Sequence, residues 1–459
     1  VTLLAALLAG ALAEVILPFG NNLLGYKLTL APLHDPQAAG FLVLLVVIVG
    51  FLSGLYPALV LSGFNPVAAL KGQSGSSLRK GLILRRGLVI AQFAISQALI
   101  FGTIVLTAQL DFWRQKDLGF ASEATVVADL PRNEAATLGT LRSRLLQDSR
   151  VHEVSFSSVS PLSDVWNGAV YHRLHGSEEE YITDFKYADA HYASLFGLKF
   201  VAGRNYQEAD SARELVVNEA FARGLGIAPQ DLIGKTIEMV KMRSNAQIRE
   251  PLPVVGVVKD FNERPLQDGI YPTLLTSYRP FYYQASIKID IHNMQEALAH
   301  IERCWSAAYP AFLFQAQFLD ERITGYYKEE ETTAGMVRIL TGLAIAIGMM
   351  GLFGLVSFMA ARRTKEIGVR KVLGAGVADI LLLFLREFAL LILIAFAVAA
   401  PAAYFVMSRW LEDFAYRITP GPGVFALSLA VTCVVAALSV GYQVVRASLA
   451  NPVSALRYE

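Results

Sequence analysis

Six runs of apolar residues, each close to or above the length needed to cross a lipid bilayer, constrain this chain more than any other feature. They cover residues 1–19, 41–61, 87–110, 337–361, 380–407 and 424–445. A helix needs about 20 mostly apolar residues to cross about 30 Å of hydrocarbon, and its backbone amides must be paired within the segment. Buried core helices of a soluble protein are the alternative, but six such runs favour a bundle of six membrane-spanning helices.

The composition agrees with a membrane protein and excludes several other classes. Charged residues make up 17% of the chain, whereas soluble domains carry about 25%. The net charge of +1 gives no general electrostatic case for nucleic-acid binding. Cys304 and Cys433 stand in segments of opposite character, so the sequence predicts neither a disulfide framework nor a cysteine-based metal site.

Lysine and arginine in the short loops predict the orientation of the spans. Twelve basic residues fall in the segments 63–86, 362–379 and 446–459, whereas the loops on the opposite side hold three basic residues balanced by three acids. Because cytoplasmic loops are enriched in lysine and arginine, the basic side is predicted to be cytoplasmic. Trp113 and Trp410 follow the outer ends of two spans, so we expect their rings in the headgroup layer.

Residues 111–334, between the third and fourth spans, are expected to form an extracytoplasmic α+β domain. Alternating or apolar runs predict strands at 125–130, 153–158, 181–187, 252–258, 287–291 and 311–317, with helices at 135–147 and 294–308. Asn293 and Glu296 are spaced as an N-cap and its capping-box partner. No proline interrupts 319–333, which predicts one continuous helix, a stiff shaft leading into the fourth span.

The end of the chain repeats an earlier segment. Residues 442–456 match residues 56–70 at seven of fifteen positions without a gap. Each copy carries the same tripeptide after an apolar span, Asn65, Pro66 and Val67 in the first and Asn451, Pro452 and Val453 in the second. Asparagine at the N-cap and proline at the first helical position predict a short helix there. We expect the first two spans to correspond to the last two, with counterparts of the intervening segments upstream of residue 1.

The most distinctive motif is the basic stretch RRTKEIGVRKVLGA, residues 362–375. Val369, Val372 and Leu373 fall on one helical face, Glu366 and Arg370 are spaced as an i,i+4 ion pair, and Gly374 can end the helix. The pattern predicts a short amphipathic helix on the cytoplasmic side. A membrane-surface loop whose charges only follow the positive-inside rule is the alternative.

This stretch closely resembles the coupling-helix signature of FtsX-like permeases, the MacB-type class of ABC transporters. The two Asn-Pro-Val segments resemble those that end each half of such permeases, and the residues 117–120, DLGF, with the insert around them, resemble a MacB-type periplasmic core domain. The resemblance implies a helical membrane bundle with one periplasmic α+β domain. It also implies that an ATPase is contacted by Arg363, Lys365, Glu366, Ile367, Gly368, Val369, Arg370, Lys371, Val372, Leu373 and Gly374.

The same resemblance implies the partners and the location. The expected partners are a cytoplasmic ABC ATPase dimer, a second permease half, a periplasmic or outer-membrane protein and membrane lipid, but no nucleic acid. No G-x-x-x-x-G-K-[ST] motif occurs in these residues, so ATP-Mg is expected in the partner ATPase and no cofactor or catalytic residue in this chain. The location implied is the bacterial inner membrane, with the large domain in the periplasm.

We therefore expect eight segments along the chain. These are the last two spans of a first FtsX-like unit (1–62), a cytoplasmic linker (63–86), a span (87–110), the periplasmic core domain with its helical stalk (111–334), a span (335–361), the coupling helix (362–379), two spans (380–446) and a cytoplasmic tail (447–459).

Other candidate residues point to structure rather than chemistry. His172 and His175 would face opposite sides of a strand, which argues against a shared metal. The acidic runs 178–180 and 329–331 fit a solvated surface. In the fourth span, Ala344, Gly348, Gly351 and Gly354 form a small-residue stripe suited to close helix packing. Gln92 and Ser96 are expected to form hydrogen bonds across the bundle.

Three functions from different classes remain at this point. The first is a permease that exports or extracts an amphiphilic substrate, such as a peptide, a drug or a lipoprotein. The second is a transmembrane regulator that passes motion to a cell-wall hydrolase or a sensor without moving cargo. The third is a membrane-anchored enzyme, which no catalytic motif in the sequence supports.

Overall fold

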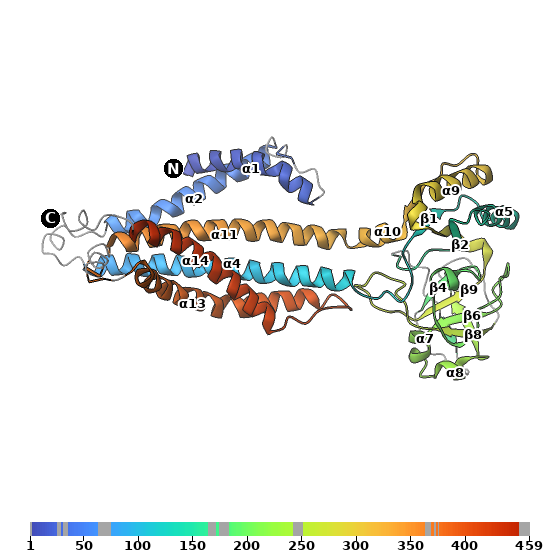
Figure 1. The fold of residues 1–459 in the computed structure, drawn as a ribbon. Coiled ribbons are helices and arrows are strands. Elements are labelled where there is room, and N and C mark those ends of the chain that lie inside the picture. Colours follow the sequence, from blue (N-terminus) through green and yellow to red (C-terminus); the bar gives the residue numbers. More distant parts are fainter. Residues whose placement is uncertain are drawn as a thin grey trace. The chain divides into compact units, whose positions relative to one another are not determined.

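The computed structural model describes residues 2–24, 29–30, 35–62, 75–163, 171–173, 183–241, 251–362, 369–370, 373–374 and 376–448 (Figure 1). Contacts between residues divide the chain into two units. We call residues 1–110, 330–410 and 419–459 the membrane unit, and residues 111–329 and 411–418 the outer unit.

The membrane unit is built from long apolar helices, which confirm the six predicted spans. They are α1 (Thr2–Leu24), α2 (Pro36–Ser62), α4 (Gly75–Arg114), α11 (Lys328–Arg362), α13 (Val377–Leu411) and α14 (Pro422–Ser448). Each contains a stretch long and apolar enough to cross a membrane. Residues 75–86 of the predicted linker are helical and continuous with the third span.

Four of these helices share one apolar core. Its buried side chains include Val89 and Phe93 from α4, Leu352 and Val356 from α11, Phe384 and Phe388 from α13, and Val440 from α14. In the most apolar stretch of α1 and of α2, none of the residues is buried. In the corresponding stretches of the other four helices, 22–44% of the residues are buried. The hairpin α1–α2 is therefore packed much more loosely than the rest of the described bundle.

The outer unit contains two β-sheets. The smaller is antiparallel throughout, in the order β11 (Ala316–Phe318), β1 (Thr125–Asp129), β10 (Gln284–Ile289) and β2 (Val151–Ser157). Two helices, α5 (Ala135–Leu145) and α9 (Met294–Ala308), share its core. The predicted apolar face of α9 is confirmed, since Ala297, Ile301 and Trp305 are all buried.

The larger sheet is mixed. Its order is β3 (Tyr171–Arg173), β7 (Thr236–Lys241), β8 (Leu252–Val258), β6 (Leu215–Asn218), β9 (Thr273–Thr276) and β4 (Asp184–Tyr187), with β5 (Phe200–Gly203) also paired to β8. The pairs β6–β8 and β4–β9 are parallel, and the other pairs are antiparallel. Short helices α6 (Tyr192–Leu195), α7 (Glu219–Gly224) and α8 (Pro229–Leu232) connect these strands.

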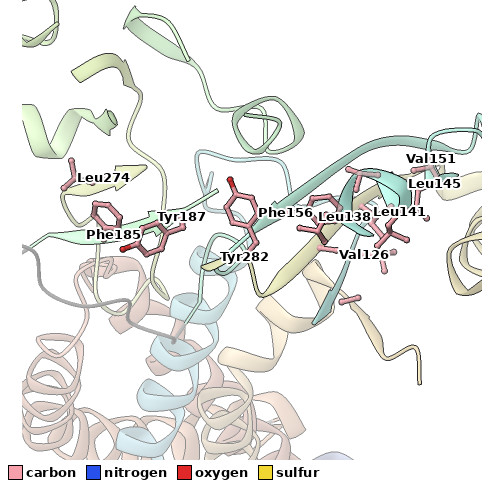
Figure 2. Close-up of a cluster of buried hydrophobic side chains, with 14 of the residues drawn as sticks. Val126, Leu138, Leu141, Leu145, Val151, Phe156, Phe185, Tyr187, Leu274 and Tyr282 are labelled. Carbon is pink, nitrogen blue, oxygen red and sulfur yellow. The ribbon is translucent and has the colours of Figure 1, made fainter. Parts of the chain in front are cut away.

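One apolar core joins the two sheets. Figure 2 shows Phe156 and Tyr282 between the apolar side chains of the smaller sheet and those of the larger sheet, Phe185, Tyr187 and Leu274. Phe156 and Tyr282 are each 2% exposed. The two sheets therefore form a single α+β domain, as predicted from the sequence.

Two local predictions in this domain are wrong. Asn293 makes no side-chain cap on α9; its Nδ2 donates to Asp290 Oδ2 instead, and Glu296 pairs with Arg150. The Asp290 carboxylate accepts from the His292 amide and stabilises a 3₁₀ turn, η3 (Ile291–Asn293), which displaces the capping box. The predicted strand 311–317 is also mostly loop, because only Ala316–Phe318 pairs with β1.

The prediction of one continuous helix from residue 319 into the fourth span is also wrong. It is two helices, α10 (Leu319–Tyr326) and α11, separated by Tyr327 with φ −101° and ψ 9°. The Tyr327 side chain is 9% exposed, and its hydroxyl accepts a hydrogen bond from the Leu266 amide at 3.2 Å. No proline lies at the break. Gly325, a weak helix former, precedes Tyr327 by two residues, and tertiary contacts of the Tyr327 ring accompany the break.

Candidate transmission site

The predicted coupling motif is only partly described by the structure. Val369, Arg370, Leu373 and Gly374 are described; the remaining motif residues Arg363, Lys365, Glu366, Ile367, Gly368, Lys371 and Val372 lie outside the described residues, as do Asn65, Pro66, Val67, Asn451, Pro452 and Val453. The Leu373 amide donates to the Val369 carbonyl at 3.0 Å, the spacing of an α-helical turn. Gly374 follows with φ +94°, a conformation that glycine adopts readily.

The apolar side chains of this turn are exposed. Leu373 is 80% exposed and Val369 is 51% exposed. Covering these two aliphatic side chains with a lipid surface or a second protein would be favourable, because it removes apolar area from water. The next helix, α13, begins shortly afterwards, and the Asp379 carboxylate accepts from the Gly376 amide at 2.9 Å at its start.

Polar contacts join α4 to its neighbours inside the bundle. Ser96 Oγ donates to the Ala344 carbonyl at 3.2 Å, which confirms the predicted cross-bundle hydrogen bond of this serine. The hydroxyls of Thr103 and Thr341 lie 2.7 Å apart. Gln97 Nε2 donates to the Ile392 carbonyl of α13 at 3.4 Å.

The small-residue stripe of α11 allows this close approach. A Cβ added at Gly351 would lie 2.3 Å from Gln92 Oε1, and one added at Gly348 would lie 3.7 Å from Ser96 Oγ. A Cβ at Gly354 would meet nothing within 4 Å. The predicted packing role therefore holds for Gly348 and Gly351 but not for Gly354.

Among the described residues, the buried polar side chains of the membrane unit are uncharged. They are Ser96, Gln97, Gln109, Thr332, Thr341, Ser428 and Thr432. Ionisable residues inside a membrane bundle are typical of ion or proton pathways, whereas serine, threonine and glutamine commonly hold helices together. The fully buried polar side chains of the described membrane unit are therefore of the kind that holds helices together.

An aromatic cluster lies where the outer unit begins. Trp113, near the end of α4, is 3% exposed; its ring centroid lies 5.3 Å from that of Tyr327 and 5.0 Å from that of Phe414. Its Nε1 donates to the Tyr416 carbonyl at 2.8 Å. We call Trp113, Tyr327, Phe414 and Tyr416 the aromatic joint.

The aromatic joint corrects one prediction and adds residues that the sequence analysis missed. Trp113 was expected in the lipid headgroup layer, but protein covers its ring. Phe414 and Tyr416 were not singled out, although two aromatic residues in one short outer loop were a visible signal. Trp410, the other predicted interfacial residue, is partly exposed.

A loop of the larger sheet, residues 259–269, lies against the same segments. The Asn262 amide donates to the Leu118 carbonyl at 2.9 Å. Gly119 has φ +79°, and a Cβ there would lie 2.6 Å from the Asp260 carbonyl oxygen, so only glycine fits this approach. The DLGF stretch noted in the sequence therefore holds the base of the sheet close to the end of α4.

Three side chains beside the smaller sheet have the order of a hydrolytic triad, but not its chemistry. Cys304 Sγ lies 3.5 Å from His300 Nε2, and His300 Nδ1 lies 3.6 Å from Asp148 Oδ2. Burial raises the pKa of the Cys304 thiol, whereas a nucleophilic cysteine needs a lowered pKa. His300 Nε2 also faces the Arg144 carbonyl at 3.2 Å, which favours a structural role.

The weaker sequence candidates are only partly described. His172 lies in β3 opposite Met239, while His175 and the acidic run 178–180 lie outside the described residues. Residues 329–331 lie on α11. Within the described residues, no group of three or more histidine, cysteine, aspartate or glutamate side chains is placed to hold a metal ion.

Comparison with known families assigns the two parts of the chain separately. Residues 87–301 match the family model described as MacB-like periplasmic core domain, and residues 338–452 match FtsX-like permease C-terminal. The first therefore covers most of α4 and most of the outer unit, and the second covers most of α11, the coupling motif and the last two spans.

Curated relatives are similar at low identity. A macrolide export ATP-binding/permease protein MacB of Neisseria gonorrhoeae (strain FA 1090) is 25% identical over 248 residues, 50% of this chain and 36% of that protein. An uncharacterized ABC transporter permease, YvrN, of Bacillus subtilis (strain 168) is 24% identical over 392 residues, 79% of this chain and 92% of that protein. The chain thus spans about a third of the length of such MacB relatives.

Two solved structures match this chain at lower identity. The periplasmic region of MacB from Actinobacillus actinomycetemcomitans has 16% identity and a TM-score of 0.32, covering 45% of this chain and 94% of that one. The extracellular domain of the transporter YknZ from Gram-positive bacteria has 15% identity and a TM-score of 0.30, covering 42% and 99%.

Proposed function

We propose that this chain, which matches the MacB-like periplasmic core domain and the FtsX-like permease models and carries six apolar helices, is an ABC transporter permease of the inner membrane with a periplasmic domain. In this function it transmits ATP-driven motion from a separate ATPase dimer to that domain. The work done there acts on an amphiphilic substrate. ATP-Mg binds in the ATPase, which supplies the hydrolysis, and the permease half that completes the complex is either a second copy or another part of a longer chain.

One observation carries the proposal: α11 is a single helix of 35 residues from Lys328 to Arg362. At 1.5 Å per residue it is about 52 Å long. Its first residue follows Tyr327 of the outer unit, and its last residue precedes the coupling motif at Arg363. A displacement of the motif therefore has a continuous hydrogen-bonded path to the base of the outer unit.

The exposed turn at Val369 and Leu373 supports the position of the ATPase contact. Burying two aliphatic side chains in a partner's groove would remove an unfavourable exposure, and the surrounding basic residues would add complementary charge for an acidic rim. We propose that the motif residues 363–374 form this contact, with Leu373 as its apolar anchor.

The amphiphilic substrate is supported by the membrane unit and by the relatives. Among the described residues of the membrane unit, no ionisable side chain is fully buried, and the Arg86–Glu387 ion pair is partly exposed, which does not favour a polar solute path through the bundle. The name of the Neisseria relative gives macrolides as its export substrate, and a macrolide is an amphiphile. The regulatory alternative, in which the domain moves a cell-wall hydrolase or a sensor, would use the same helix.

Co-purification with the cognate ATPase tests the proposal. We expect Leu373→Asp and Glu366→Arg to lower ATPase binding by at least about tenfold. Leu373→Asp replaces the apolar anchor with a charge, and Glu366→Arg replaces the predicted Glu366–Arg370 ion pair of the helix with two like charges. Arg79→Glu, a charge reversal in the other predicted cytoplasmic segment, serves as the matched control. If both motif variants bound the ATPase as tightly as wild type does, the proposed contact would be contradicted.

A second measurement separates transport from regulation. The purified full chain is offered a panel of fluorescent amphiphiles and, separately, a periplasmic extract for cross-linking. Saturable binding of an amphiphile that ATP turnover releases supports the transporter, whereas ATP-dependent capture of one periplasmic enzyme or sensor supports the regulator.

A further inference from the structure

The link between α13 and α14 makes its contacts with the outer unit, although the helices on either side of it belong to the membrane unit. The link, residues 411–418, buries Leu411 and Phe414, which are 2% and 9% exposed. Its Ala415 amide donates to the Gln267 carbonyl at 2.9 Å. A loop that only reversed the chain direction between two spans would need none of these contacts.

Trp113 is the residue on which these contacts converge. Its ring packs edge-on against Phe414 at 78°, and its indole N–H donates to the Tyr416 carbonyl. The Lys116 ammonium, one turn later, lies 4.6 Å from the centroid of the Tyr416 ring. The link is thus held through a backbone hydrogen bond, an aromatic pair and a cation–π contact, all from the segment that ends α4.

The same indole contacts the start of α11. Tyr327 immediately precedes α11, and its ring lies 5.3 Å from that of Trp113. One side chain at the end of α4 therefore touches segments that continue directly into α11, α13 and α14. These four helices are also the ones that share the apolar core of the membrane unit.

We propose that Trp113 is a positioning residue that keeps the 411–418 link attached to the outer unit throughout the transport cycle, so that movement of α13 and α14 reaches the outer unit as well as movement of α11. This inference rests on the proposed function, because it presupposes nucleotide-driven movement of the spans. It adds a second transmission route to the one through α11.

The loop 259–269 gives this route a path into the larger sheet. Gln267 accepts the Ala415 hydrogen bond, and a Cβ added at Gly269 would lie 3.0 Å from the Ala415 Cβ. At the other end of this loop, Lys259 follows β8 directly. A displacement of the link would therefore act on the end of β8 through a short segment.

Hydrogen exchange of the full chain tests the attachment. In Trp113→Ala we expect the 411–418 amides to exchange at least about tenfold faster, since the indole contacts and the hydrogen bond are lost together. Trp113→Phe keeps a ring against Phe414 but removes the N–H donor, so its effect should be intermediate. Tyr283→Ala, which truncates a half-exposed aromatic of the same unit, is the matched control.

Exchange in the β1 and β10 amides reports whether each variant is folded. If Trp113→Ala also lost protection in β1 and β10, the exchange of the 411–418 amides would be compared between Trp113→Phe and wild type instead. Protection of the link that is unchanged in both variants would overturn the attachment.

The transmission is tested in the complex with the ATPase. Wild type should show a change in exchange at residues 259–269 on binding a non-hydrolysable ATP analogue, and Trp113→Ala should reduce that change at least about threefold while ATPase binding is kept. A full response in Trp113→Ala would overturn the inference and leave the proposed function intact. Absence of any ATPase binding or response in wild type would overturn both.

A cross-link tests the statement that the link stays attached. Asp268→Cys and Ala415→Cys are combined, with Cys304 and Cys433 replaced by alanine, and joined by a short bismaleimide. ATP turnover of the complex should stay within about twofold of the uncross-linked sample. A contact that persists throughout the cycle can be cross-linked without blocking any step. A block of turnover would show that the link must detach, and would overturn the inference.

Discussion

The Lys186 ammonium donates a hydrogen bond to Glu263 Oε2 in the interior of the outer unit, where the two side chains are 5% and 4% exposed. Lys186 Nζ also donates to the Ser160 carbonyl at 3.0 Å. Burial lowers the pKa of Lys186 and raises the pKa of Glu263 to about 7, because desolvation disfavours each charge more than the pairing favours it. Removing one partner should therefore be much more damaging than removing both.

Lys186→Met should destabilise the outer unit by about 3–5 kcal/mol at pH 8, since it leaves a buried carboxylate without a cation. Glu263 in the folded unit has a pKa above the ordinary value of 4.5, so its contribution to stability is present below that value and is lost as pH rises through the folded pKa. The variant should therefore melt at a higher temperature at pH 5.5 than at pH 8. Thermal unfolding of the full chain, followed by tryptophan fluorescence, measures this.

The double variant Lys186→Met/Glu263→Leu is the control for that experiment. It removes both charges and should recover most of the lost stability, with no added pH dependence from this site. If the single variant were as stable as wild type at pH 8, the pair would have no role in the fold.

The contact of β5 with β8 allows a second prediction. Gly203 has φ +72°, and a Cβ there would lie 2.1 Å from the Val255 carbonyl oxygen. Gly203→Ala should lower the stability of the outer unit by about 1–2 kcal/mol, because alanine disfavours the left-handed conformation. It should lower stability further because the backbone must shift to make room for the Cβ. Gly234→Ala is the matched control, because Gly234 has φ +82° but nothing within 4 Å of the added Cβ.

The same thermal unfolding assay compares the two alanine variants. We expect Gly234→Ala to lower stability by about 1 kcal/mol and Gly203→Ala by at least about twice as much. Equal effects would mean that β5 moves away from β8 without cost.

The membrane helices and the main strands were predictable, because their signals are local. Apolar length alone located the six spans, and the periodicity of residues 294–308 identified the buried face of α9. The break at Tyr327 was missed because its local signal is weak: Gly325, two residues earlier, disfavours a helix by only about 1 kcal/mol relative to alanine. It accompanies contacts with Trp113 and Leu266, which are distant in sequence.

The candidate site divides in the same way. The coupling motif is a contiguous pattern, so it could be read from the sequence, although its role stays a prediction. The aromatic joint brings together residues near 113, 327 and 414, and only the fold shows that they meet. Lys186 and Glu263 are similar: a lysine between Phe185 and Tyr187 in a predicted strand was visible, but its partner was not.

A buried carboxylate between the two sheets gives a third prediction. Asp189 follows β4 and is completely buried; its Oδ1 accepts from Ser155 Oγ at 2.7 Å and its Oδ2 from the Phe156 amide at 2.8 Å. Arg142 of α5 provides the cation. Arg142→Gln should destabilise the domain by about 3 kcal/mol, because the carboxylate remains buried without its partner.

A surface ion pair is the matched control for this substitution. Arg279 pairs with Asp210, whose side chain is 73% exposed. Arg279→Gln should change stability by less than about 1 kcal/mol, the usual value of an exposed pair. Urea unfolding of the full chain, monitored by hydrogen exchange in β2 and β4, measures both; an equal effect of the two variants would contradict the bridging role of Asp189.

The contact of α4 with α11 gives the last prediction, since α11 carries the proposed transmission and packs on α4 at Gly351. Gly351 faces Gln92, whose amide would lie 2.3 Å from an added Cβ, while Gly354 is open. Gly351→Val should separate the helices locally and lower the melting temperature, whereas Gly354→Val should have little effect. Gly351→Ala should be milder than valine, because the end of the Gln92 side chain can rotate away. In the complex, Gly351→Val should also weaken the nucleotide response of the outer unit, and a variant that melted early but kept the full response would show that the α4–α11 contact supports the fold without taking part in transmission.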